Sequence, residues 1–217
     1  MTLKYSCFIS YPHGRTDFTT TFIEQLTETL ESYLDPLLDL DDLGVYVDRR
    51  RLEPGYLYNE ALAEAICQSI CMIVVYSPKY RRRSYCLREY AAMERLEQRR
   101  REILGDRTEN ELGMIIPIIF RGEVKKLPAK IRERRHYCDF SKFTTASTNI
   151  SQNEEYVKEI EKIAQIVYRH YENFENLAES AFGPCDAFEL PSEEEVERAW
   201  RGSSGRPDQG FPGRAME

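Results

Sequence analysis

The sequence predicts an α/β domain built on a doubly wound, five-stranded parallel sheet flanked by helices. Short segments rich in β-branched and aromatic residues alternate with longer segments whose apolar residues recur every three or four positions. One short segment, residues 70–76 (ICMIVVY), is apolar throughout, as are strands buried on both faces of a parallel sheet. The alternation and the apolar segment together favour a sheet covered by helices on both sides.

The predicted strands are short and run into residues that break regular structure. Residues 5–10 lead into residues 11–14 (YPHG), and residues 70–76 lead into Ser77 and Pro78. Pro117 lies inside the fourth strand, which favours a place near the sheet edge or a bulge, because proline cannot donate to a ladder. The five predicted strands are residues 5–10, 44–48, 70–76, 114–120 and 136–140.

Each predicted helix carries one apolar stripe. Thr16 or Asp17 can cap the first helix, and Pro36 with the acidic residues after it closes that region. The four helical regions are about residues 17–36, 62–69, 85–102 and 153–177. Their stripes consist of Phe18, Phe22, Leu26 and Leu30; Leu62, Ala65, Ile66 and Ser69; Leu87, Tyr90, Met93 and Leu96; and Tyr156, Ile160, Ile163, Val167, Tyr171 and Phe174.

The composition changes after Gly183. The 34 residues that follow hold eight acidic and four basic side chains, and residues 202–213 are rich in Gly, Ser and Pro. Within this tail, residues 193–200 can form one short helix. We therefore expect a main domain over residues 1–180 and an acidic, partly disordered extension or linker over residues 181–217.

Bulk composition argues against two classes of partner. The chain has 217 residues and a net charge of −7, whereas a general nucleic-acid binder is more often basic. No window approaches the ~18 apolar residues of a membrane span, and the N-terminus lacks the apolar stretch of a signal peptide. We expect a cytoplasmic protein with no direct contact to nucleic acid or membrane.

The cysteines predict neither disulfides nor a metal site. No pair has C-x-x-C spacing, no Cys/His cluster has zinc spacing, and several cysteines lie inside strand-like segments. We expect reduced, mostly buried thiols. The six residues are Cys7, Cys67, Cys71, Cys86, Cys138 and Cys185.

Three motifs stand at the ends of predicted strands. Residues 7–11 read CFISY, residues 48–55 read DRRRLEPG, and residues 84–89 read SYCLRE. In this order they resemble three boxes of the Toll/interleukin-1 receptor (TIR) family: F-I-S-Y, D-x-R-x-L-x-P-G and W-C-x-x-E. The resemblance covers about residues 4–175, is nearest to bacterial members, and implies the flavodoxin-like TIR fold.

The resemblance also implies a site. It makes Glu89 the catalytic residue, and it sets around the ligand Tyr11, Pro12, His13, Asp48, Arg50 and Tyr85. Two positions depart from the family pattern: Tyr85 stands where many relatives have Trp, and Pro12-His13 stands where many have Arg or Lys. The first keeps an aromatic ring, and the second would alter how the loop closes on a ligand. A loop histidine such as His13 is more often a simple surface residue, and the ligand-binding interpretation stands as the alternative.

Catalytic TIR domains cleave the bond between nicotinamide and ribose in NAD, and this reaction can run on one carboxylate. The nicotinamide nitrogen of NAD is already cationic, so the leaving group departs neutral without the general acid that ordinary glycosidases need. Glu89 would stabilise the oxocarbenium-like transition state, and Tyr85, four residues earlier, shares its helix face. NAD is thus a substrate, and no cofactor is expected. Capture by water gives ADP-ribose, and capture by adenine gives a cyclic isomer; both stay open.

The family further implies a homo-oligomer or filament, with the loop Arg49–Gly55 of one copy completing the site of another. The lead hypothesis is therefore a bacterial immune (anti-phage) or toxin-like effector that consumes NAD once it self-associates. Two alternatives stand beside it: a non-catalytic adaptor that signals through TIR–TIR contacts, and a sensor that binds nucleotide without cleaving it. A glutamate in a first helical turn commonly just suits the helix dipole, and the arginines at 49–51 and 81–83 commonly form solvated faces.

Overall fold

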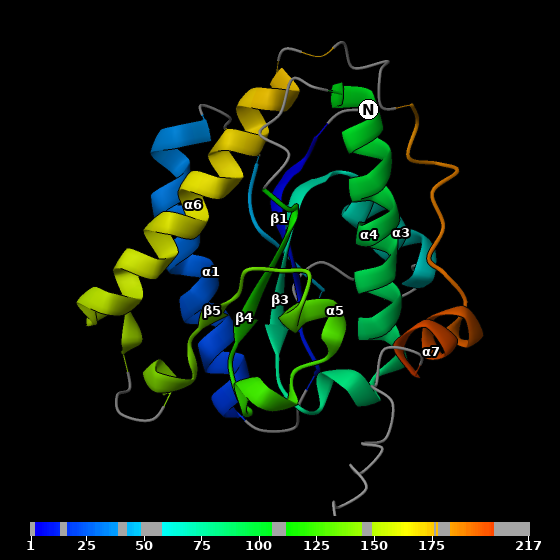
Figure 1. Cartoon of the computed structure of the whole chain (residues 1–217). Helices are drawn as coiled ribbons and strands as arrows, with labels where there is room; N and C mark the ends of the chain where they lie inside the picture. The colour runs from blue at the N-terminus through cyan, green and yellow to red at the C-terminus, as the bar shows by residue number, and fades with distance from the viewer. Residues whose placement is uncertain are drawn as a thin grey trace, which may run out of the picture.

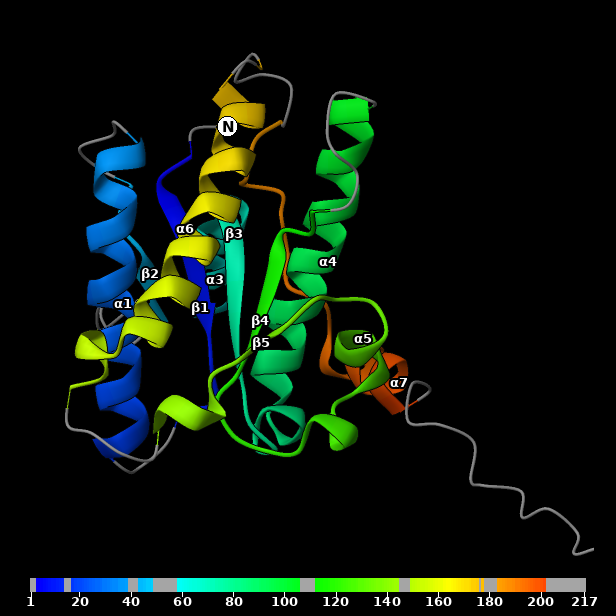
Figure 2. The same ribbon diagram turned by 60° about the vertical axis from the view of Figure 1, so that its left-hand side comes forward.

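A computed structural model describes residues 3–13, 17–38, 43–48, 58–105, 112–144, 149–175, 177 and 183–201. All strand pairs in its five-stranded sheet are parallel, in the order β2-β1-β3-β4-β5. Helices α1 and α6 cover one face, and α3 and α4 cover the other (Figure 1, Figure 2). This is a doubly wound sheet of the flavodoxin-like order, so the predicted fold class is confirmed.

The strands match the predicted segments but are shorter at the sheet edges. They are β1 Tyr5–Ser10, β2 Tyr46–Val47, β3 Ser69–Tyr76, β4 Ile115–Ile119 and β5 Cys138–Asp139. The outer strands β2 and β5 keep only two residues each, and each pairs with a single neighbouring strand. Pro117 pairs with Val74 of β3, and the ladder between β4 and β5 begins one residue later at Ile118.

Two helix boundaries differ from prediction. Helix α1 continues past Pro36 and ends at Leu38. A proline in the last turn removes a hydrogen bond only near the helix end, so the rest of the helix stays intact. Ser69 opens β3 instead of continuing the helix before it, and its hydroxyl donates to the Ala65 carbonyl at 2.7 Å. The longer helices are α1 Asp17–Leu38, α3 Tyr58–Cys67, α4 Ser84–Leu104, α6 Glu154–Glu175 and α7 Glu193–Arg201. The short helical turns are η1 Tyr80–Arg82, η3 Val124–Lys126, α5 Ala129–Arg132, η4 Ser141–Thr144 and η5 Ile150–Gln152.

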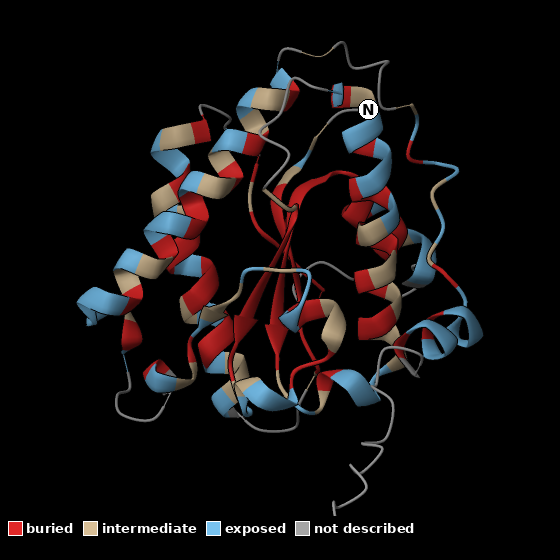
Figure 3. Ribbon diagram, viewed as in Figure 1, coloured by how far each residue is buried: buried red, intermediate tan, exposed pale blue. Residues whose placement is uncertain are grey.

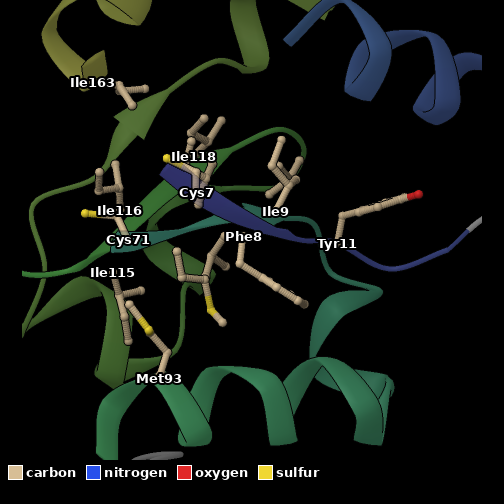
Figure 4. Packing of buried hydrophobic residues seen from close by; sticks show 14 of the residues in the cluster. Cys7, Phe8, Ile9, Tyr11, Cys71, Met93, Ile115, Ile116, Ile118 and Ile163 are labelled. Carbon is tan, nitrogen blue, oxygen red and sulfur yellow. The ribbon is translucent and has the colours of Figure 1, made fainter. Parts of the chain in front are cut away.

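The core lies on both faces of the central strands (Figure 3). All eight residues of β3 are buried, as a strand covered from both sides requires. Met93 of α4 and Ile163 of α6 flank the strands from opposite sides, and both are fully buried (Figure 4). These two apolar layers hold the carboxyl ends of the strands in fixed positions.

The prediction that all six cysteines are reduced is wrong for two of them. Cys67, at the end of α3, forms a disulfide with Cys185, 118 residues later. Spacing along the chain could not predict this pair, because only the fold brings the two Cα atoms within 5.8 Å. Among the remaining four, Cys7, Cys71 and Cys86 are buried thiols, and burial raises the pKa of each.

The predicted short helix of the tail is confirmed as α7, and it packs on α4. The Trp200 ring meets Tyr90 edge-on at 5.2 Å, and both Trp200 and Val196 are buried. The Arg88 guanidinium donates to the Pro191 carbonyl at 2.6 Å. Residues 183–201 therefore lie against the main domain, and the boundary at residue 180 stays a prediction. In the described part of the chain, no helix meets the length and hydropathy of a membrane span.

Candidate functional site

The candidate site lies where β1 and β2 end and α4 begins. Because the strands are parallel, their carboxyl ends share one edge of the sheet. Ile9 pairs with Val47, so Ser10 and Asp48 follow at neighbouring positions on that edge. Tyr11 continues from β1 at the same end (Figure 4), and the first turns of α4 bring Glu89 beneath Ser10.

Glu89 is buried, with 3% of its surface exposed. Its Oε2 lies 2.6 Å from the Ser10 hydroxyl, which lies 2.8 Å from the Tyr80 hydroxyl. Tyr80, itself fully buried, donates to the Cys86 carbonyl at 3.1 Å. The carboxyl group thus ends a chain of three short polar contacts inside the protein.

Burial favours a protonated carboxyl group at Glu89. The Ser10 hydroxyl donates to Oε2 of Glu89, and the Tyr80 hydroxyl donates to the Cys86 carbonyl. Burial raises the pKa of Glu89 to about 8, while the Ser10 hydrogen bond lowers it and the nearby Asp48 carboxylate raises it. At neutral pH the carboxyl group therefore holds its proton in this arrangement.

His13 joins three predicted site residues to one another. Its Nε2 lies 3.4 Å from an Asp48 carboxylate oxygen, and its backbone N–H donates to the Tyr85 hydroxyl at 2.7 Å. Its ring centre lies 4.8 Å from that of Tyr11 and 5.3 Å from that of Tyr85. The side chain is 27% exposed, so His13 is a packed part of the site rather than a surface-loop histidine.

Several predicted residues are brought together, and several were missed. Three of the predicted residues are buried beside the carboxyl ends of β1 and β2: Tyr11, Pro12 and Asp48. Arg50, with the rest of the loop Arg49–Gly55, lies outside the described residues. Sequence reasoning missed Ser10, Tyr80 and Lys79, whose ammonium donates to the His13 carbonyl at 2.7 Å. Ser10 belongs to the F-I-S-Y motif and could have been found there, but the other two gave no local signal.

The arrangement has no obvious metal ligands. Over the part of the chain that the structure describes, His, Cys, Asp and Glu form no group of three that could hold a metal ion. The polar atoms at the site are instead a carboxyl group, two hydroxyls, an imidazole and a second carboxylate. Such a set suits hydrogen bonding to the hydroxyls of an organic ligand and stabilisation of a developing positive charge.

The fold and site define a doubly wound α/β domain with an acidic residue buried at the carboxyl edge of its sheet. The chain matches the family model of the TIR domain over residues 7–153, a stretch that contains all three motifs. The chain therefore belongs to the TIR domain family, as the motifs predicted. A comparison with curated proteins gives no match. The family includes members that cleave NAD, and its domains commonly self-associate.

Proposed function

We propose that this protein cleaves the nicotinamide–ribosyl bond of NAD, with Glu89 as the catalytic carboxylate. The observation that carries the proposal is the position of Glu89, buried at the carboxyl edge of the sheet beside Ser10 and Asp48. Doubly wound sheets bind ligands at this edge. A titratable group with a perturbed pKa at such a place is a candidate for chemistry.

Binding of NAD would convert the closed site into a working one. A ribose hydroxyl can replace the Ser10 hydroxyl as the donor to Glu89, because the two groups offer the same hydrogen bond. The cationic nicotinamide ring beside Glu89 would lower the pKa of its carboxyl group and ionise it. The carboxylate then stabilises the positive charge that develops on the ribose as neutral nicotinamide leaves. The Tyr85 ring, on the same helix face, would pack against the substrate.

We also propose that self-association activates the site. Glu89 is covered in the single chain, and the family commonly self-associates. The loop Arg49–Gly55 of a neighbouring copy would hold the opened site, with Arg50 near the phosphates of NAD. In a bacterial cytoplasm the resulting loss of NAD would make the protein an immune or toxin-like effector.

The test is nicotinamide release from NAD by the purified chain, followed by chromatography. Glu89→Ala and Glu89→Gln should each lower the rate by about 10²–10³-fold, the cost of removing one charge-stabilising group. Glu102→Gln, at an exposed glutamate of the same helix, is the matched control and should act like the wild type. The same chromatograms separate ADP-ribose from a cyclic isomer. Equal release by the Glu89 variants and the wild type would remove Glu89 from the mechanism.

A second candidate function is that of a non-catalytic adaptor. It is favoured by one observation: the contacts of Glu89 are filled by the protein's own Ser10 hydroxyl, as those of a purely structural carboxyl group would be. In that case the concentrated protein would self-associate but release no nicotinamide from NAD. A protein that binds NAD in calorimetry and leaves it intact would instead be a nucleotide sensor.

A further inference from the structure

A second pocket lies at the same sheet edge, beyond β3 and β4. Its volume is about 520 Å³, within the range of pockets that hold small organic ligands. It is lined by Tyr76, Pro78, Arg81, Arg82, Gly122, Glu123 and Lys126. Glu89 and the other candidate site residues are not among these, so the pocket is separate from the candidate site.

The pocket concentrates positive charge on an acidic protein. Arg81, Arg82 and Lys126 face one carboxylate, that of Glu123, while the whole chain carries a net charge of −7. Glu123 pairs with Lys126 at 2.5 Å, so the two guanidinium groups form the most cationic part of the lining. Guanidinium groups bind phosphate through paired N–H donors, which makes a phosphate ester the fitting class of ligand.

The backbone that carries Arg81 and Arg82 is fixed in place by a buried neighbouring residue. Arg81 and Arg82 belong to η1, whose first residue, Tyr80, is fully buried. The Tyr80 hydroxyl contacts Ser10 and the Cys86 carbonyl, so η1 is anchored to both β1 and α4. A fixed backbone lowers the ordering cost when the arginine side chains close on a ligand.

The opposite wall suits a flat, partly apolar group. Tyr76, the last residue of β3, is buried, and Pro78 two residues later is exposed. Gly122 lies close to Pro78: its φ is +116°, and a Cβ added there would lie 3.3 Å from the proline ring. The exposed Pro78 ring offers apolar surface for a nucleobase or ribose, while Glu123 can accept from ribose hydroxyls.

We propose that this pocket binds a nucleotide through its phosphate groups, with Arg81 and Arg82 as the phosphate ligands. The proposal is independent of NAD cleavage, because it uses none of the residues assigned to that reaction. A pocket of this size and charge would take a nucleoside diphosphate more readily than an uncharged nucleoside.

Calorimetric titration of the full chain with ADP tests the proposal. ADP should bind at least about tenfold more tightly than adenosine, since the phosphates carry the charge-assisted contacts. The double variant Arg81→Gln/Arg82→Gln should weaken ADP binding by about tenfold or more. Lys158→Gln/Arg169→Gln removes the same charge from the pocket on α6 and should leave binding within about twofold. Equal binding of ADP and adenosine, or equal weakening by both double variants, would overturn the proposal.

Amide NMR signals locate the ligand independently of affinity. ADP should shift the signals of Arg81, Arg82 and Gly122 more than those of Ser10 and His13. The opposite pattern would place ADP at the Glu89 site and refute the second pocket. Glu89→Gln should bind ADP like the wild type even if the protein proves unable to cleave NAD, so the two proposals can fail separately.

Discussion

At the scale of single residues, the central feature is a carboxyl group whose protonation depends on its neighbours. The Ser10 hydroxyl donates to Glu89 and also contacts the Tyr80 hydroxyl, while burial of the Glu89 carboxyl group raises its pKa and favours the protonated form. Catalysis needs the ionised form, so the state that is stable in the single chain differs from the state that would act on NAD. Because the folded state raises the pKa of this buried group, the stability of the protein depends on pH, and its activity would depend on pH as well.

The first prediction concerns the pH dependence of stability. Burial raises the pKa of Glu89 from 4.5 to about 8, so between these values the folded state keeps a proton that the unfolded state has released. Wild-type stability therefore falls through this window, by at most roughly 1.4 kcal/mol per pH unit from this group. Glu89→Gln cannot ionise, so its free energy of unfolding should rise relative to the wild type between pH 5 and pH 8. Urea unfolding at both values measures this, and parallel pH curves for the two proteins would contradict it.

At the scale of elements, hydrogen bonds between residues far apart in the sequence hold the helices to the sheet. The fully buried Arg100 of α4 donates to the carbonyls of Cys67, Ser69 and Ile70, where α3 turns into β3. Its guanidinium also lies 5.1 Å from the ring centre of Phe174 on α6. Desolvation lowers the pKa of Arg100 to about 10, and it stays charged at neutral pH. The apolar stripes predicted each helix but not the hydrogen bonds of Arg100. Arg100 stands between two other arginines in the sequence, and such a run is typical of a solvent-exposed helix face.

A second prediction concerns the hydrogen bonds that Arg100 donates to the three carbonyls. Arg100→Met keeps most of the side-chain volume but removes the donors to three buried carbonyls, and it should destabilise the fold by about 3–5 kcal/mol. Arg99→Met, at the exposed neighbouring position, is the control and should change stability by less than about 0.5 kcal/mol. Urea unfolding at pH 7 compares the two. A small, equal effect of both substitutions would show that the buried guanidinium contributes nothing.

The third prediction concerns the link between α3 and the tail. Because Cys67 and Cys185 are joined, alkylation of the unfolded, unreduced protein should label four of the six cysteines, and labelling after reduction should reach six. Loss of the link in Cys185→Ser should lower stability by about 2–4 kcal/mol, since the bond constrains a long loop of the unfolded chain. Cys138→Ser, at an unbridged cysteine, controls for the substitution itself. Six labelled cysteines before reduction would exclude the disulfide.

At the scale of the whole molecule, the two regions proposed to bind ligands share one edge of the sheet. The region around Glu89 lies at the ends of β1 and β2, and the cationic pocket lies at the ends of β3 and β4. Tyr80 and the turn η1 lie between them and contact both. On the far side of α4, helix α7 packs against Tyr90. The tail also reaches the first turns of α4, where Ser84 donates to Glu193 and Arg88 donates to the Pro191 carbonyl, so a second copy that approaches the Glu89 region would meet the tail as well.

The fourth prediction is that assembly raises activity. NAD cleavage per molecule should increase with protein concentration in step with the oligomer fraction, because a neighbouring copy would supply part of the site. Arg50→Glu should lower both quantities together, and Arg132→Glu, on the exposed surface of α5, should change neither. Sedimentation and nicotinamide release at matched concentrations measure the two. A specific activity that stays constant across concentration would contradict the assembly mechanism.

The sequence alone predicts the alternation of strands and helices, the buried parallel sheet and the three motifs of the TIR family. These follow from local periodicity and from residues next to one another in the chain, which local physics controls. Only the tertiary structure shows that Ser10 donates to Glu89, that His13 lies beside Asp48, and that Cys67 is bonded to Cys185. Each of these contacts joins residues at least 35 positions apart, and only packing of the whole chain brings such residues together. Burial of Glu89, and with it the raised pKa, is likewise a property of the fold.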